Sequence, residues 1–220
     1  MKNRMIVWWK RLFYKYIGTN SEFYIWYLIN MILNPKSVYE TSRYQFSLTQ
    51  QWHRRDRSIT KLIFLINIVI VLIYAFTFSS PFSFIPYILF NLGFSLFFGI
   101  IISIVLYYVV ISVFKTGEVF TVRYSYDIHN NAYLCYLFIN KVIIFILSPI
   151  LLQKGMIFTI LSNVILFFGY SYYFYVTYLG YAILPFIKVP QKALIIPIAI
   201  MGIFVVFCTM CNYNIASLWI

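Results

Sequence analysis

The chain has 220 residues, of which 63% are apolar and 10% are charged, and its mean hydropathy is +0.85. This composition excludes an ordinary soluble enzyme or binding domain, and it indicates an integral membrane protein with room for about five crossings of about 20 residues each. The net charge of +12 is compatible with nucleic acid, with anionic lipid or with membrane topology alone, so the distribution of Lys and Arg decides its meaning.

Residues 1–58 are predicted to form a cytoplasmic, amphipathic segment that lies against the membrane. The stretch "MIVWWKRLFYKYI" mixes Trp and Tyr with Lys and Arg, which is typical of a helix at a membrane surface. The next stretch, "SEFYIWYLINMILNP", starts with Ser21 in a capping position and stops at Asn34 and Pro35. Its apolar part is too short to span a bilayer, so we expect it to lie in the interface or to pack under the bundle.

Residues 59–220 are predicted to form an all-α, polytopic transmembrane domain. The apolar runs that serve as spans are at about 59–78, 84–114, 133–152, 156–184 and 193–211. Of the 17 Lys and Arg, 11 lie in residues 1–61 and four more follow the second and fourth spans, whereas the opposite side has only Lys154. The positive-inside rule therefore predicts a cytoplasmic N-terminus and a lumenal C-terminus.

Lys141 is predicted to lie inside the third span, where a charged amine is costly. The five predicted spans contain no Asp or Glu, so its partners would be carbonyls, Tyr hydroxyls or the amides of Asn91, Asn140 and Asn163. Two interpretations stay open. The side chain reaches an interface or is a neutral buried amine, or it belongs to the intramembrane polar site of a small transporter or lipid-handling protein.

The stretch "DIHNNA", residues 127–132, places an acid, an imidazole and two amides directly before the third predicted span. Asp127 and His129 alone are too few ligands for a metal site, so helix capping and loop hydrogen bonding by Asp127, Asn130 and Asn131 is the favoured interpretation. No cofactor motif and no set of nucleophile and base is recognisable. The sequence therefore predicts no cofactor, no metal site and no enzyme.

Two spans carry stripes of residues suited to close packing. The stripe in the second span consists of Ser95, Gly99 and Ser103, and it lets another helix approach closely. The stripe in the fourth span consists of Tyr170, Tyr173, Thr177 and Tyr181, with polar tips that can bond to neighbouring helices. Gly180 beside that stripe permits close approach, and Pro185 ends or kinks the span.

Three segments together resemble the uncoordinated-50 (Unc-50) family of Golgi membrane proteins. They are "NPKSVYETSRY" leading into "QWHRRD", then "YSYDIHNNAY", then "YYFYVTYLGYAILPFIK". The resemblance extends over nearly the whole chain from Glu22. The family usually has Trp-Ala-Arg-Asp-Asp-Pro in the first segment; here Trp52, Arg54 and Asp56 match that pattern, and His53, Arg55 and Arg57 depart from it.

The resemblance implies a protein of the Golgi or early secretory pathway that supports vesicle trafficking or the delivery of membrane proteins. It implies a scaffold that recruits a cytoplasmic factor such as a large Arf guanine-nucleotide exchange factor. The expected partners are membrane lipids, that exchange factor, a membrane-protein cargo and, through the basic N-terminal segment, RNA. The oligomeric state is not predicted.

With a cytoplasmic N-terminus, all three segments reach the cytoplasmic side, and we predict that they form one surface for a partner. The predicted members of that surface are Trp52, Arg54, Asp56, Asp127, His129, Asn131, Tyr175, Tyr178, Gly180, Tyr181, Pro185 and Lys188.

Overall fold

A computed structural model of the protein describes residues 21–49, 58–80, 82–114, 120–185 and 187–218, and its elements over these ranges are all helical. Five helical stretches are long and apolar enough to cross a membrane. They are Ser58–Phe78, Phe84–Val113, Val122–Leu151, Met156–Ala182 and Lys192–Met210. The predicted all-α architecture with five spans is therefore confirmed.

The third span is longer than the sequence indicates. Helix α6 (Val122–Leu137) begins well before the predicted start and continues through the π-helix η1 (Phe138–Ile143) into α7 (Ile144–Leu151). The predicted loop and capping role of residues 127–131 is wrong, because these residues lie within α6. A run of polar residues ordinarily indicates a loop, but Asn130 and Asn131 are buried between helices here.

Two shorter helices, α2 (Ser21–Leu33) and α3 (Pro35–Thr49), precede the spans. Asn34 separates them as expected, and Pro35 suits the first turn of α3 because its missing N–H would have no helical acceptor there. The buried face of α2 repeats at helical spacing and consists of Tyr24, Tyr27 and Met31. Helix α2 contacts α6 and α3 contacts α8, so this part of the N-terminal segment packs on the bundle.

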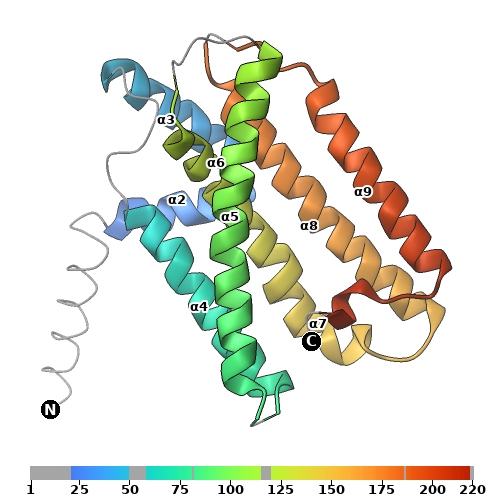
Figure 1. Ribbon diagram of the computed structural model, residues 1–220. Helices are drawn as coiled ribbons and strands as arrows, with labels where there is room; N and C mark the ends of the chain where they lie inside the picture. Colours follow the sequence, from blue (N-terminus) through green and yellow to red (C-terminus); the bar gives the residue numbers. More distant parts are fainter. Residues whose placement is uncertain (1–20, 50–57, 81, 115–119, 186, 219–220) are drawn as a thin grey trace, which may run out of the picture.

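The bundle is arranged around α6. Helices α4 (Ser58–Phe78), α5 (Phe84–Phe114) and α8 (Met156–Ala182) pack on α6, and α9 (Lys192–Met210) packs on α8. In Figure 1 the end of α5 and the α8–α9 connection lie at the top, here called the upper end. The α4–α5 and α7–α8 turns lie at the opposite, lower end.

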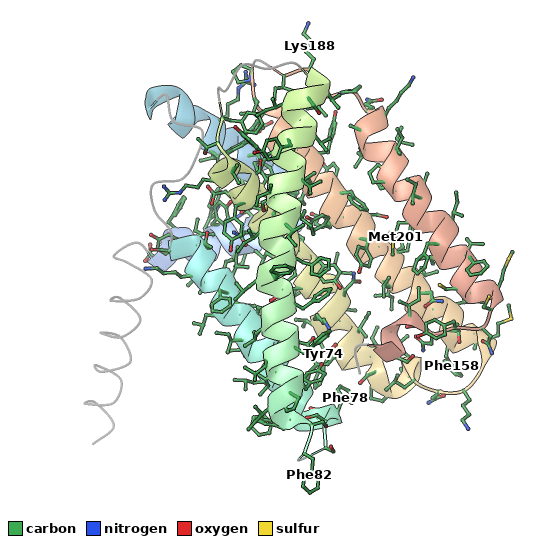
Figure 2. The ribbon with its side chains drawn as sticks, viewed as in Figure 1. Tyr74, Phe78, Phe82, Phe158, Lys188 and Met201 are labelled. Atoms are coloured by element: carbon green, nitrogen blue, oxygen red, sulfur yellow. The ribbon has the colours of Figure 1, made fainter. Side chains whose placement is uncertain are left out.

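The outer faces of α5 and α9 are apolar and exposed. Phe97 on α5 and Ile203 on α9 are 63% and 72% exposed, and Figure 2 shows similar carbon-rich side chains projecting from both helices. Lys188 projects from the upper end in the same view, and Phe82 projects from the lower end. Outward apolar faces of this kind are those that membrane-spanning helices present to lipid.

Candidate functional site

Two tyrosines join the upper parts of α6 and α8. Tyr124 on α6 donates to the carbonyl oxygen of Gly180 at 2.6 Å, and Tyr181 on α8 donates to the hydroxyl of Ser125 at 2.8 Å. Both bonds are buried. Since a hydrogen bond in an apolar interior is costly to leave unmade, these two bonds set the rotation of α8 against α6.

Gly180 on α8 lies close to side chains of both α6 and α3. A methyl group built on its Cα would lie 2.8 Å from a side-chain carbon of Ile128 and 3.0 Å from the Tyr39 hydroxyl. Ile128 is 1% exposed, so its side chain has little space into which to move. Gly180 therefore permits the close packing of α8 that the sequence predicts, because any larger side chain would collide with Ile128 and Tyr39.

Asn131 connects α6 to both N-terminal helices. The hydroxyl of Tyr27 on α2 donates to Oδ1 of Asn131 at 3.0 Å, and Nδ2 of Asn131 donates to the Tyr39 hydroxyl on α3 at 3.3 Å. Burial raises the pKa of Tyr39 above its ordinary value, so this hydroxyl stays protonated. Tyr172 on α8 donates to the carbonyl oxygen of Ile32 at 2.7 Å, which adds a further link to α2.

These contacts bring parts of all three segments named in the sequence analysis into one cluster, which we call the polar junction. It consists of Tyr27, Tyr39, Tyr124, Ser125, Asn131, Tyr172, Gly180 and Tyr181. Its polar atoms bond mainly to one another inside the protein. The polar junction is therefore a device that holds α2, α3, α6 and α8 together.

The predicted partner surface divides into buried and exposed members. His129, Asn131, Gly180 and Tyr181 are buried, so their assignment to a surface that touches a partner is corrected: they contact neighbouring helices. Asp127, Tyr175 and Tyr178 are half-buried, and Pro185 and Lys188 are exposed. Trp52, Arg54 and Asp56 lie outside the described residues.

His129 packs against the small-residue stripe of α5. Its Nδ1 is hydrogen-bonded to the Tyr173 hydroxyl at 2.8 Å, and its Nε2 lies 2.9 Å from where a Cβ of Gly99 would be. Ser103 donates to the carbonyl oxygen of Gly99 at 2.5 Å, and Ser95 accepts a bond of 2.9 Å from Asn67 on α4. The predicted stripe therefore packs within the chain, and no cluster of three potential metal ligands occurs among the described residues.

A cavity of about 480 Å³ lies between α4, α5, α6 with η1, and α8. Lys141 and Asn91 line it, together with His129 and many aromatic side chains. Ligand sites in proteins have volumes of roughly 300–1,000 Å³, so this cavity is large enough for a small molecule or part of a lipid.

The wide turn η1 presents Lys141 to this cavity. The hydrogen bonds of a π-helix join residues five apart rather than four, and such turns occur frequently at functional sites. Tyr74 on α4 donates to the carbonyl oxygen of Lys141 at 2.8 Å, while Nζ of Lys141 lies 5.1 Å from the centre of the Tyr74 ring. The tyrosine thus holds both the backbone and the amine, the latter through a cation–π contact.

The other two amides of the predicted polar site do not line this cavity. Nδ2 of Asn140 donates weakly to the Leu166 carbonyl oxygen at 3.4 Å, and the Asn140 side chain fills the space that a Cβ of Gly169 would need. Asn163 donates to Thr209 and accepts from the Ile215 backbone at the C-terminal end of the described chain. The predicted grouping of four residues is therefore corrected to Lys141 and Asn91, because the other two face different helices.

Comparison with known proteins shows the family to which this chain belongs. The family model described as the UNC-50 family matches residues 9–220. The chain belongs to the UNC-50 family. No solved structure matches it.

Relatives of this UNC-50 family member come from distant organisms. The chain is 30% identical to the protein unc-50 homolog of Dictyostelium discoideum, over 84% of this chain and 75% of that protein. It is 26% identical to unc-50 homolog A of Xenopus laevis, over 93% and 81% of the two chains. It is 28% identical to protein unc-50 of Caenorhabditis elegans, over 89% and 66%.

Several residues of the junction were not singled out from the sequence of this UNC-50 family member. Tyr27 and Tyr39 come from short helices, and Tyr124 lies in a stretch interpreted as a loop. The helical spacing of Tyr24, Tyr27 and Met31 is the signal that would have marked a buried face on α2. Nothing in the sequence indicates that this face meets Asn131.

Proposed function

We propose that this protein is a non-enzymatic scaffold of Golgi or early secretory membranes that supports the traffic of membrane proteins. In this proposal its upper end faces the cytoplasm and recruits a cytoplasmic factor such as a large Arf guanine-nucleotide exchange factor. Family membership supports the proposal, as does the excess of Lys and Arg on the predicted cytoplasmic side.

The observation that carries the proposal is the polar junction. It bonds helices from distant parts of the chain into one unit, so side chains on its outside are held in fixed relative positions. A pre-organised surface loses less entropy when a partner binds. The exposed Lys188 lies beyond the end of α8, and the exposed Lys192 is the first residue of α9. Both lysines suit a partner with an acidic patch.

The first test reverses these two charges. The variant with Lys188→Glu and Lys192→Glu is expected to recruit the Arf exchange factor to Golgi membranes roughly fivefold less than the unchanged protein, because like charges at an interface repel. Both lysines are exposed, so folding is expected to be unaffected. Recruitment is measured by fluorescence microscopy in cells depleted of their own UNC-50 family protein.

A matched control is Lys154→Glu, which changes an exposed lysine in the α7–α8 turn at the lower end. It is expected to leave recruitment unchanged. Normal recruitment by the double variant, in cells where that variant reaches the Golgi, contradicts the proposal. Epitope tags at the two termini, probed before and after the membranes are permeabilised, test the proposed orientation.

Cargo binding and RNA binding stay secondary proposals. Of the 11 Lys and Arg in residues 1–61 that would contact RNA, eight lie outside the described residues. A role in handling lipids is favoured by one specific feature, the cavity at Lys141, and it is developed below.

A further inference from the structure

The cavity beside α5 is long and follows the direction of the spans. Its α5 wall repeats at steps of three and four residues from Tyr87 to Leu106, which is one face of the helix. At a rise of about 1.5 Å per residue, this face extends over roughly 28 Å, which is close to the thickness of the hydrocarbon core of a bilayer. The cavity therefore runs in the direction of the lipid chains and is long enough to hold one of them.

The one Lys among the described residues of the wall lies toward one end of the cavity. Lys141 and Asn91 lie toward the lower end, close to Tyr74 near the end of α4 and to Tyr87 near the start of α5. Among the described residues that line the cavity there is one Lys, and there is no Arg, Asp or Glu. Aromatic and aliphatic side chains form most of the rest.

The cavity also adjoins the outer surface of the bundle. Phe94 and Phe98 on α5 line it, and they are 39% and 42% exposed. The neighbouring faces of α5 are apolar and suited to contact with lipid. A hydrocarbon chain therefore has a route of similar polarity from the bilayer into the cavity.

We propose that this cavity binds an anionic lipid, with the phosphate or carboxylate of its headgroup at Lys141 and Asn91 and one hydrocarbon chain along α5 toward Leu106. An anionic oxygen stabilises a lysine amine in a surrounding of low polarity, and the aromatic wall covers the chain. One N–H of the Asn91 amide is bonded to the Tyr87 carbonyl oxygen, and the other offers a second donor near the headgroup. This inference is independent of the recruitment of a cytoplasmic factor.

Photocrosslinking of the full chain in lipid nanodiscs tests the inference. The probes are phosphatidic acid and phosphatidylcholine, each with a photoreactive diazirine at the end of one acyl chain, and labelled positions are found by mass spectrometry. We expect phosphatidic acid to label cavity residues between Gly99 and Leu106 on α5, and more strongly than phosphatidylcholine does. The replacement Lys141→Met is expected to lower that labelling about tenfold, and Lys141→Arg is expected to retain it.

A second pair of variants tests the path of the hydrocarbon chain of the lipid and leaves Lys141 unchanged. Ile102→Trp fills the cavity and is expected to remove the labelling, whereas Ile104→Trp places the same side chain on the exposed side of α5 and is expected to leave it intact. Labelling confined to outward-facing residues would overturn the proposal. So would equal labelling of the unchanged protein and the Lys141→Met and Ile102→Trp variants, or equal labelling by the two lipids.

Discussion

Replacing Gly180 with leucine is expected to lower the free energy of unfolding by about 3 kcal/mol, in the upper part of the range for overpacked cores. The cause is steric: even a methyl group at this position would lie within 3.0 Å of both Ile128 and the Tyr39 hydroxyl. A larger side chain would push α8 away from α6 and α3. It would also lengthen the bond from Tyr124 to the Gly180 carbonyl oxygen.

Thermal melting of the detergent-solubilised chain measures this effect, with Gly180→Ala as a milder variant of intermediate stability. The matched control is Gly93→Leu on α5, where a Cβ would meet nothing within 4 Å. That control is expected to melt close to the unchanged protein. Equal melting temperatures for Gly180→Leu and Gly93→Leu would show that the close approach at Gly180 does not contribute to stability.

Replacing Asn131 with leucine is expected to cost about 2–4 kcal/mol, because it takes one hydrogen-bond partner from each of two buried tyrosine hydroxyls. Tyr27 and Tyr39 are 2% and 4% exposed, so water cannot easily replace the lost partner. The expected structural result is the release of α2 and α3 from α6, while the spans stay packed.

Hydrogen exchange monitored by mass spectrometry distinguishes this release from general unfolding. Backbone amides of residues 21–49 are expected to exchange faster in Asn131→Leu, with little change in α8 and α9. Asn91→Leu is the control, because the bond that Asn91 donates goes to the Tyr87 carbonyl oxygen of its own helix. Unchanged exchange in α2 and α3 would mean that the bonds made by Asn131 do not hold these helices.

Asn131→Leu and the charge-reversal variant of Lys188 and Lys192 together connect the stability of the polar junction with the proposed function. If the polar junction positions the surface that recruits a cytoplasmic factor, Asn131→Leu should reduce recruitment although Lys188 and Lys192 are unchanged. The charge-reversal variant should reduce recruitment with no loss of stability. Together the two variants distinguish the contribution of the polar junction, which positions the surface, from that of the lysines, which contact the partner.

The position of Lys141 bears on its two interpretations, as an amine that reaches an interface or is buried and neutral, and as part of an intramembrane polar site. The amine lies over the Tyr74 ring and in a cavity wall, which favours an amine buried within the bundle. The sequence could identify Lys141 as costly because a cation in an apolar run is conspicuous. The sequence could not show which of Asn91, Asn140 and Asn163 lines the same cavity as Lys141. That depends on the direction in which η1 presents its side chains and on which helices lie opposite.

The sequence by itself determined the membrane class, the number of spans and the approximate limits of four of them, because apolar length is a local property that the bilayer imposes on each helix. It also indicated that Gly99 and Gly180 permit close packing. Only the tertiary structure decided that residues 124–131 are helical and that Asn131 holds α2 and α3. In this stretch Tyr124, Ser125 and Asn131 are hydrogen-bonded to partners about 50 to 100 residues away in the chain. A sequence pattern reports the polarity of a residue, but the partner that permits its burial comes from the fold.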